Sequence, residues 1–230
     1  AGLSKPLMFC DIEPWSRKVL AKHWPDVPIA EDVKELASDP ARLVPDCDIL
    51  TAGYPCPPFS VAGKRRGEED DRHIWPEIFA IVQAKLPSWC VFENVPGHIS
   101  LGLDQVLSDL ESCCYATQAF CLPACGVDAP HRRDRIFVVA HADSSGLQGG
   151  AQTRNDEKNR TQPDDKQFAR RSGAHKSSEG RSTLWKPEPN ISRVSHGLPR
   201  RVDRIKGLGN AIVPQIAMNI GLTIKAVRNG

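Results

Sequence analysis

The chain has 230 residues, of which 40% are hydrophobic and 25% charged, and its formal net charge at pH 7 is +2. This length and composition predict one large globular domain, or one domain with a small addition, and exclude a small secreted disulfide scaffold. No apolar run approaches the roughly 18 residues of a membrane span, so no membrane partner is expected. The eight cysteines are scattered, which favours a reducing, cytoplasmic compartment.

Strand-like and helical patterns alternate along residues 7–140. The apolar run 7–10 is expected to be a buried strand, and Pro14 is expected to begin a helix after it. The pattern further predicts helices at 74–86 and 103–110 and strands at 48–52, 89–92, 115–122 and 135–140. Strands that alternate with helices and are apolar on both faces indicate an α/β fold, with a parallel-type sheet covered by helices on each side.

The character of the sequence changes after residue 142. Residues 144–179 are nearly devoid of large apolar side chains, and residues 151–206 contain 14 Lys and Arg against 7 Asp and Glu. This excess of positive charge favours a polyanionic partner, although a solvated polar insert is an open alternative. A final helix is expected at about 214–227.

One thiol stands in an unusually stiff setting. The stretch GYPCPPFS, residues 53–60, places Cys56 among three prolines directly after the 48–52 strand. The prolines fix φ and hold the thiol in place, whereas a structural cysteine behaves as a small hydrophobe and needs no such loop. Sites in open α/β sheets form at the carboxyl ends of strands, where Asp11, Cys56 and Glu93 are all expected. Cys56 is therefore predicted to be a nucleophile, with a Pro-rich turn as the alternative.

Cations alternate at the start of the 135–140 strand. His131, Arg133 and Arg135 are expected to share one face because side chains of a strand alternate between its two faces. Such a row offers fixed cations to a ring oxygen and a phosphate. Salt bridges at an exposed strand end are the competing interpretation.

Several segments in this order resemble the cytosine-C5 DNA methyltransferase family: FCDIEPWSRKVLAKHWPDVPIAEDV, GYPCPPFSVAGKRRG, VFENVPG, PHRRDRIFVVA and RIKGLGNAIVPQIA. The resemblance covers residues 8–140 and about 191–225. It implies a Rossmann-like S-adenosylmethionine-dependent methyltransferase sheet with a small, irregular target-recognition region. The implied domains are a catalytic domain at 1–141, a target-recognition insert at 142–206 and a C-terminal helix at 207–230 that returns to the catalytic domain.

The resemblance also implies a reaction. The enzyme would transfer a methyl group from S-adenosylmethionine to carbon 5 of a cytosine flipped out of double-stranded DNA, as a monomeric restriction-modification or phage enzyme in a prokaryotic cytoplasm. The Cys56 thiolate would add to carbon 6, and Glu93, with a raised pKa, would protonate ring nitrogen 3. Arg135 is assigned to the cytosine and Arg133 to support of the site. An RNA cytosine-C5 methyltransferase and an inactive DNA-binding remnant are the alternatives.

The family pattern further assigns binding residues. Asp11 would bind the ribose, Ile12 would pack on adenine and Asp32 would meet its amino group. The complete set of residues implied to bind the donor is Asp11, Ile12, Asp32, Val33, Pro55, Asn210 and Ala211. A loop that closes over the base and its phosphates would carry the DNA-binding residues Ser60, Lys64, Arg65 and Arg66, unless it is simply a solvated charged loop.

One family element is not found in this sequence. The family's opening Phe-Ala-Gly-x-Gly-Gly loop, which wraps the methionine end of the donor, has no counterpart among residues 1–230. We therefore expect methyl transfer by these residues alone to be absent or very weak, and apolar surface beside Phe9 and Val91 to be exposed.

We predict that residues 151–206 carry most of the affinity for DNA. Deleting residues 151–180 should weaken duplex binding several-fold and flatten its dependence on salt, because fewer counterions are released. Fluorescence anisotropy over a salt series measures both quantities. An unchanged affinity together with an unchanged salt slope would contradict the prediction.

Overall fold

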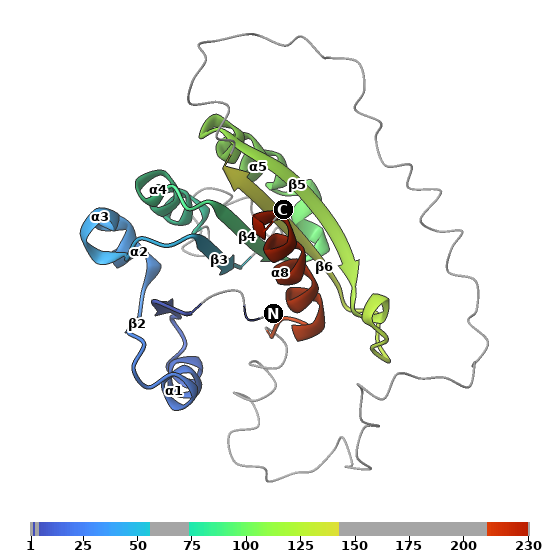
Figure 1. Cartoon of the computed structure of the whole chain (residues 1–230), viewed down its shortest axis with the longest axis horizontal. Coiled ribbons are helices and arrows are strands. Elements are labelled where there is room, and N and C mark those ends of the chain that lie inside the picture. Colours follow the sequence, from blue (N-terminus) through green and yellow to red (C-terminus); the bar gives the residue numbers. More distant parts are fainter. Residues whose placement is uncertain (1, 3–4, 56–73, 143–210, 230) are drawn as a thin grey trace, which may run out of the picture.

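A computed structural model describes residue 2 and residues 5–55, 74–142 and 211–229 (Figure 1). Its elements are β1 Phe9–Cys10, α1 Pro14–His23, β2 Ile29–Ala30, α2 Val33–Ser38, α3 Pro40–Leu43, β3 Ile49–Gly53, α4 Trp75–Lys85, β4 Trp89–Asn94, the 3₁₀ turn η1 Pro96–Ser100, α5 Leu103–Ser112, β5 Tyr115–Pro123, the 3₁₀ turn η2 Ala124–Val127, β6 Asp134–Ala142 and α8 Pro214–Asn229. Among the predicted site residues, those outside the described ranges are Cys56, Ser60, Lys64, Arg65, Arg66 and Asn210.

The larger sheet has the strand order β3-β4-β6-β5. β3 is parallel to β4, whereas β6 is antiparallel to both β4 and β5. The α/β prediction is confirmed, but the expectation of a parallel sheet is wrong for β5 and β6. The connection through η2 between these two strands is short. Parallel neighbours need a crossover of a dozen or more residues, so β5 and β6 pair as antiparallel neighbours. The continuous apolar run of β6 instead reflects its position between β4 and β5, with helices on both faces of the sheet.

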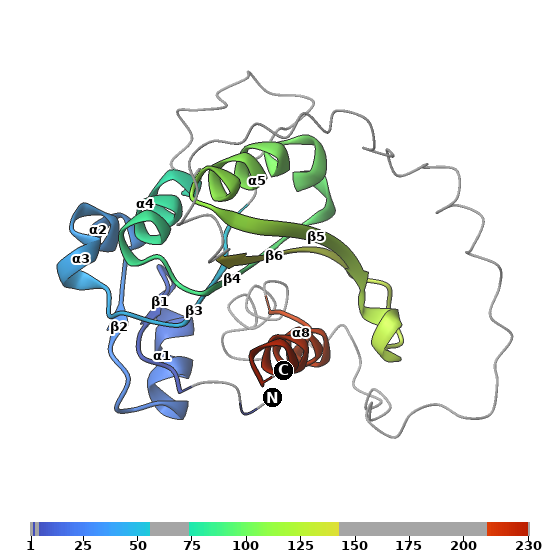
Figure 2. The same ribbon diagram turned by 45° about the horizontal axis from the view of Figure 1, so that its top comes forward.

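Two hydrophobic cores lie on opposite faces of this sheet. α4 and α5 cover one face and α8 covers the other (Figure 2). Because side chains alternate along a strand, β6 places Ile136, Val138 and Ala140 in the first core and Phe137 in the second. Val213, which directly precedes α8, and Ile216 within α8 pack into the second core. α8 thus packs on the sheet that carries Glu93. The boundaries of the insert, expected at 142–206, stay predictions. None of the helices in the described ranges is long and apolar enough to cross a membrane.

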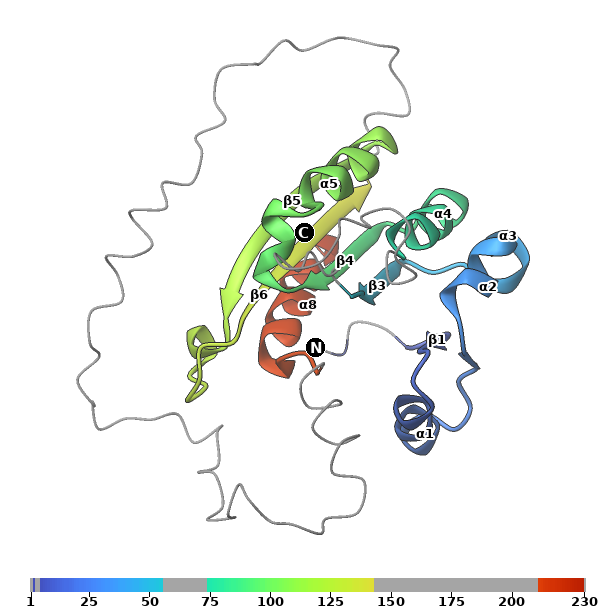
Figure 3. The same cartoon turned by 180° about the vertical axis from the view of Figure 1, so that it is seen from behind.

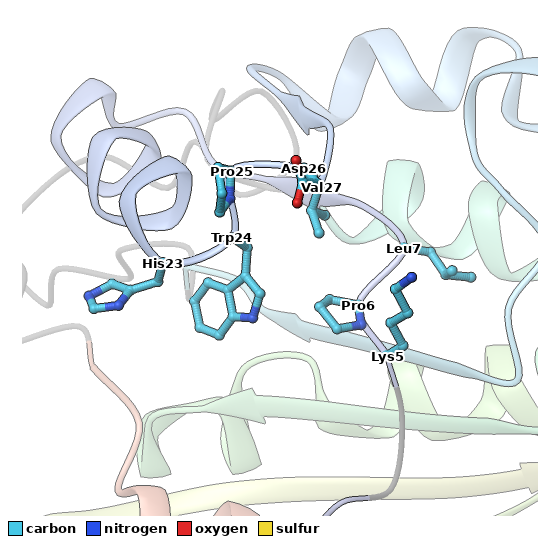
Figure 4. A pocket seen from close by; sticks show the side chains of 8 residues that line it. All are labelled: Lys5, Pro6, Leu7, His23, Trp24, Pro25, Asp26 and Val27. Atoms are coloured by element: carbon cyan, nitrogen blue, oxygen red, sulfur yellow. The ribbon is translucent and has the colours of Figure 1, made fainter.

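A second, two-stranded sheet pairs β1 with β2 in parallel and lies beside the edge strand β3 (Figures 1 and 3). No residue of α1 is buried, and the side chains of Leu7 and Trp24 are 46% and 43% exposed. These two line a hollow of about 440 Å³ between residues 5–7 and 23–27 (Figure 4). Phe9 and Val91, expected to flank exposed apolar surface, are themselves half-buried. A two-stranded sheet with so little burial is marginally stable by itself.

We expect the β1–α1–β2 unit to open far more easily than the larger sheet. Backbone amides within residues 9–30 should exchange with deuterium on the order of 100-fold faster than those of β4 and β6, because few buried apolar contacts oppose their opening. Hydrogen-exchange mass spectrometry at neutral pH measures both regions in one sample. Equal protection of the two regions would show that the unit is held by contacts outside the described residues.

Candidate active site

Glu93 lies inside the larger sheet, near the carboxyl end of β4. It faces Gly53 of β3 and Phe137 of β6 in the strand register. The sequence pattern placed it just after a strand ending at residue 92, but β4 continues to Asn94 because both of its edges are paired. A Cβ atom on Gly53 would lie 3.3 Å from Glu93 Oε2, so the absence of a side chain at Gly53 leaves room for the carboxylate.

The carboxylate of Glu93 has an ion-pair partner on the neighbouring strand. Arg135 Nε lies 2.8 Å from Glu93 Oε1, and each side chain is only 17% exposed. Burial raises the pKa of Glu93, and the positive charges of Arg135 and Arg133 lower it, with burial the larger effect. The net shift favours a protonated carboxyl at higher pH than a free glutamate allows. A carboxyl of this kind can donate a proton to a ring nitrogen.

Arg133 joins this group from outside the strand. β6 begins at Asp134, and Arg133 has a φ of 38°, in the left-handed region. The prediction that His131, Arg133 and Arg135 alternate along one strand face is therefore wrong, because the regular strand does not reach residue 133. The Arg133 guanidinium instead donates a hydrogen bond of 2.6 Å to the carbonyl oxygen of Ala211. Arg133 thus links the surroundings of Glu93 to the segment that precedes α8.

Three buried polar side chains lie at or just after the ends of β3 and β4, and the contact between two of them was not foreseen from the sequence. Asn94 is buried, and its Oδ1 accepts a 2.8 Å hydrogen bond from the backbone of Val95. Tyr54 and His98 are also buried, with 3.0 Å between the tyrosine hydroxyl and His98 Nε2. A signal for this pair existed in the sequence: Tyr54 stands two residues before Cys56, and His98 stands five residues after Glu93. Spacing alone could not show that the two side chains meet.

A second group of acids lies on the two-stranded sheet. Asp11 Oδ1 accepts a 2.8 Å hydrogen bond from the backbone of Glu13, and Asp32 Oδ1 caps α2 through the backbone of Lys34 at 2.9 Å. Burial raises the pKa of the Cys10 thiol to about 11, and the negative charges of Asp32 and Asp11 contribute to that shift. Both carboxylates therefore lie close enough to one thiol to act on it.

Comparison with known proteins identifies the group to which this arrangement belongs. Residues 2–193 match the family model of the C-5 cytosine-specific DNA methylases.

The chain belongs to the C-5 cytosine-specific DNA methylase family.

Its relatives include two bacterial type II methyltransferases. The Bacillus subtilis enzyme M2.BsuMI is 30% identical over 142 residues, which are 58% of this chain and 35% of that protein. The Neisseria lactamica enzyme M.NlaIV is 34% identical over 147 residues, 58% of this chain and 34% of that one. The chain therefore spans about a third of the length of these relatives. A DNMT2 triple mutant from Spodoptera frugiperda, 19% identical, matches the fold with a TM-score of 0.51 over 66% of this chain and 46% of its own.

The structure brings together part of the site expected for a cytosine methylase. Glu93, Arg133, Arg135 and Ala211 form one group at the end of β4, and Asp11 and Asp32 form the other. Ile12 and Pro55 are exposed, and Val33 packs against the first core. No group of metal ligands occurs among the described residues. The roles of these residues in the methylase stay predictions.

We predict that the Glu93→Gln variant gains stability relative to the parent methylase as the pH rises. The folded-state pKa of Glu93 lies above its unfolded value, so its contribution is fully present below about pH 4 and is lost as the pH rises through the folded pKa. Urea unfolding of both proteins between pH 4 and pH 8 measures the difference. The control is Glu35→Gln on the exposed surface of α2. A difference that stays constant with pH, or that changes in the opposite direction, would contradict the prediction.

Proposed function

We propose that this chain acts as a DNA (cytosine-5-)-methyltransferase on cytosines flipped out of double-stranded DNA. The observation that carries the proposal is Glu93, whose side chain is 17% exposed and whose pKa is raised, ion-paired to Arg135 beside the end of β3. β3 leads through Tyr54 and Pro55 directly to Cys56. Membership of the cytosine methylase family and the bacterial type II relatives support the same reaction.

The thiol and the carboxyl divide the chemistry between them. Carbon 5 of cytosine is a poor nucleophile. When the Cys56 thiolate forms a bond to carbon 6, the electron pair of the carbon 5–carbon 6 double bond shifts toward carbon 4, and charge builds up on nitrogen 3, which Glu93 stabilises by giving that nitrogen a proton. Carbon 5 would then form a bond to the electrophilic methyl group as the bond between that methyl group and its donor breaks. After methylation, a base removes the proton of carbon 5, the carbon 5–carbon 6 double bond forms again as the thiolate leaves carbon 6, and nitrogen 3 returns its proton to Glu93.

The arginines stabilise the charged states of this sequence. While Glu93 is ionised, Arg135 pairs with it and compensates a carboxylate that is largely removed from water. When Glu93 holds a proton, the guanidinium of Arg135 is free to donate to the oxygen of the cytosine ring. Arg133 keeps a positive charge near the same carboxyl while its hydrogen bond to Ala211 holds the start of α8 in place.

S-adenosylmethionine would supply the electrophilic methyl group. The described residues fit its adenosine end, since Asp11 and Asp32 place two carboxylates around Cys10 and the neighbouring Ile12 is 65% exposed. Carboxylates in this position accept hydrogen bonds from ribose hydroxyls and from an amino group. Asn210 and the loop residues Ser60, Lys64, Arg65 and Arg66 complete the proposed binding residues outside the described ranges.

We predict that Cys56 forms a covalent adduct with duplex DNA in which cytosine is replaced by 5-fluorocytosine. Fluorine replaces the proton that must leave carbon 5 and cannot be removed by a base, so the adduct should persist on a denaturing gel when S-adenosylmethionine is present. Cys56→Ser should abolish trapping, and Glu93→Gln should slow it by about 10²- to 10⁴-fold. Cys114→Ser, which changes an exposed thiol, is the matched control.

Three results would oppose the proposal in different ways. Equal trapping by Cys56→Ser would reject the nucleophile, and faster trapping of RNA of the same sequence would favour an RNA methyltransferase. Retained DNA binding without donor binding, measured by calorimetry, would indicate a DNA-binding protein without this activity.

A further inference from the structure

A buried hydrogen bond connects the end of β3 with the turn that follows β4. The hydroxyl of Tyr54 lies 3.0 Å from Nε2 of His98, and the two residues are 6% and 4% exposed. Tyr54 follows the last residue of β3, and His98 is the central residue of η1. Forty-four positions separate them along the chain, so only the fold brings them together.

The pair is surrounded by aromatic rings. The ring of Tyr54 lies 5.6 Å from that of Trp75 and 6.5 Å from that of Phe92, between centroids, and it meets the His98 ring edge-on at 5.5 Å. Polar groups in such surroundings cost free energy unless they are hydrogen-bonded. A phenylalanine and a leucine could fill similar space without that cost. Packing alone therefore gives no reason for a tyrosine and a histidine at these positions.

The local structure holds each partner firmly. The His98 backbone donates to the carbonyl oxygen of Val95 at 3.0 Å and accepts from the backbone of Leu101 at 3.1 Å, which fixes the turn. Gly102, with a φ of 147°, ends the turn close to the imidazole, since a Cβ atom there would lie 3.4 Å from His98 Cε1. On the other side, the indole of Trp75 is anchored by a 2.7 Å hydrogen bond to Asp109. The backbone of His98 and the indole of Trp75 are thus both held in place.

The two partners lie beside the two residues that carry the proposed chemistry. Tyr54 directly precedes Pro55 and stands two residues before Cys56, and the η1 turn begins two residues after Asn94, which ends the strand of Glu93. Gly53 and Glu93 are themselves register partners in the sheet. A bond between Tyr54 and His98 therefore ties together the exits of the two strands.

We propose that the Tyr54–His98 hydrogen bond fixes the exit of β3, up to Pro55, relative to Glu93, which makes Tyr54 and His98 positioning residues for methyl transfer. The inference rests on the proposed function for its role in catalysis, but the tie between the two strand exits can be measured without any activity. A thiol and a carboxyl that act on adjacent atoms of one ring must keep a fixed separation, and a displacement of about 1 Å can cost on the order of 10²-fold in rate.

Burial is consistent with the role of His98. It lowers the pKa of the imidazole, so His98 is neutral at pH 7 and can either donate to the tyrosine hydroxyl or accept from it. Its Nδ1 is buried and has no hydrogen-bond partner within the described residues. Nε2 therefore makes the one hydrogen bond of the imidazole seen there, and that bond is directed at Tyr54.

A double-mutant cycle separates positioning from simple stabilisation. Tyr54→Phe and His98→Leu each remove one partner of a buried hydrogen bond, so each should lower the urea midpoint of unfolding. The double variant replaces both with apolar groups and should recover most of that midpoint. If the bond positions the loops, hydrogen exchange in peptides covering 48–56 and 95–102 should be about tenfold faster in all three variants, the recovered double variant included.

Trapping of 5-fluorocytosine DNA provides the functional measurement. Adduct formation should slow by at least about tenfold in all three variants, while His98→Gln, which restores a polar group near Nε2, should recover part of the rate. Phe79→Leu is the matched control, because it removes a ring stacked on Trp75 at 6.0 Å without removing a hydrogen bond. Phe79→Leu should change local exchange and trapping less than the three variants of Tyr54 and His98 do.

Each outcome decides a separate point. Parent-like exchange and trapping in the double variant would overturn the proposal and leave the pair a purely structural role. Faster local exchange in all three variants would support the tie between the strand exits even where the parent traps no DNA. In that case the proposed function fails, and the positioning contact stands without its catalytic meaning.

Discussion

The candidate site depends on the pairing of β4 along both of its edges. β3 on one side and β6 on the other hold this strand in register from Trp89 to Asn94, and the helices above and below bury its alternate side chains. A glutamate near the end of such a strand is removed from water without freedom to move away. Its carboxylate must then either hold a proton or meet a cation, and Arg135 on β6 is the cation that the register supplies.

The same register explains the neighbours of Glu93. Gly53 lies opposite Glu93 on β3, where a larger side chain would crowd the carboxylate. Tyr54 directly follows Gly53 at the end of β3. Asn94 then turns the chain into η1, which brings His98 back against Tyr54. A strong ion pair and a neutral hydrogen bond thus lie within a few residues of each other. The first opposes the rise in the pKa of Glu93 that burial causes, and the second connects the exits of β3 and β4.

Much of the fold could be predicted from the sequence because its signals are local. The helices beginning near Pro14, Trp75 and Leu103 and the four strands of the larger sheet follow from apolar spacing and helix-start residues. The short elements β2, α2 and α3 carry too few apolar residues to show a period. The direction of β5 and β6 depends on a connection length that apolar runs do not reveal, and the left-handed backbone of Arg133 and the Tyr54–His98 bond depend on tertiary contacts.

The two halves of the proposed chemistry lie on two different sheets. Glu93 and Arg135 belong to the four-stranded sheet with a core on each face, whereas Asp11 and Asp32 follow the two strands of the smaller sheet. Its helix α1 buries no residue, and Val33 after Asp32 packs against the first core. Methyl transfer requires donor and base to meet in one geometry, and such positioning contributes on the order of 7–11 kcal/mol in favourable cases. For the proposed reaction, we therefore expect the junction between the two sheets to matter as much as the groups around Glu93. Contacts that join β1 to β3 would strengthen donor positioning without altering the acid or the thiol.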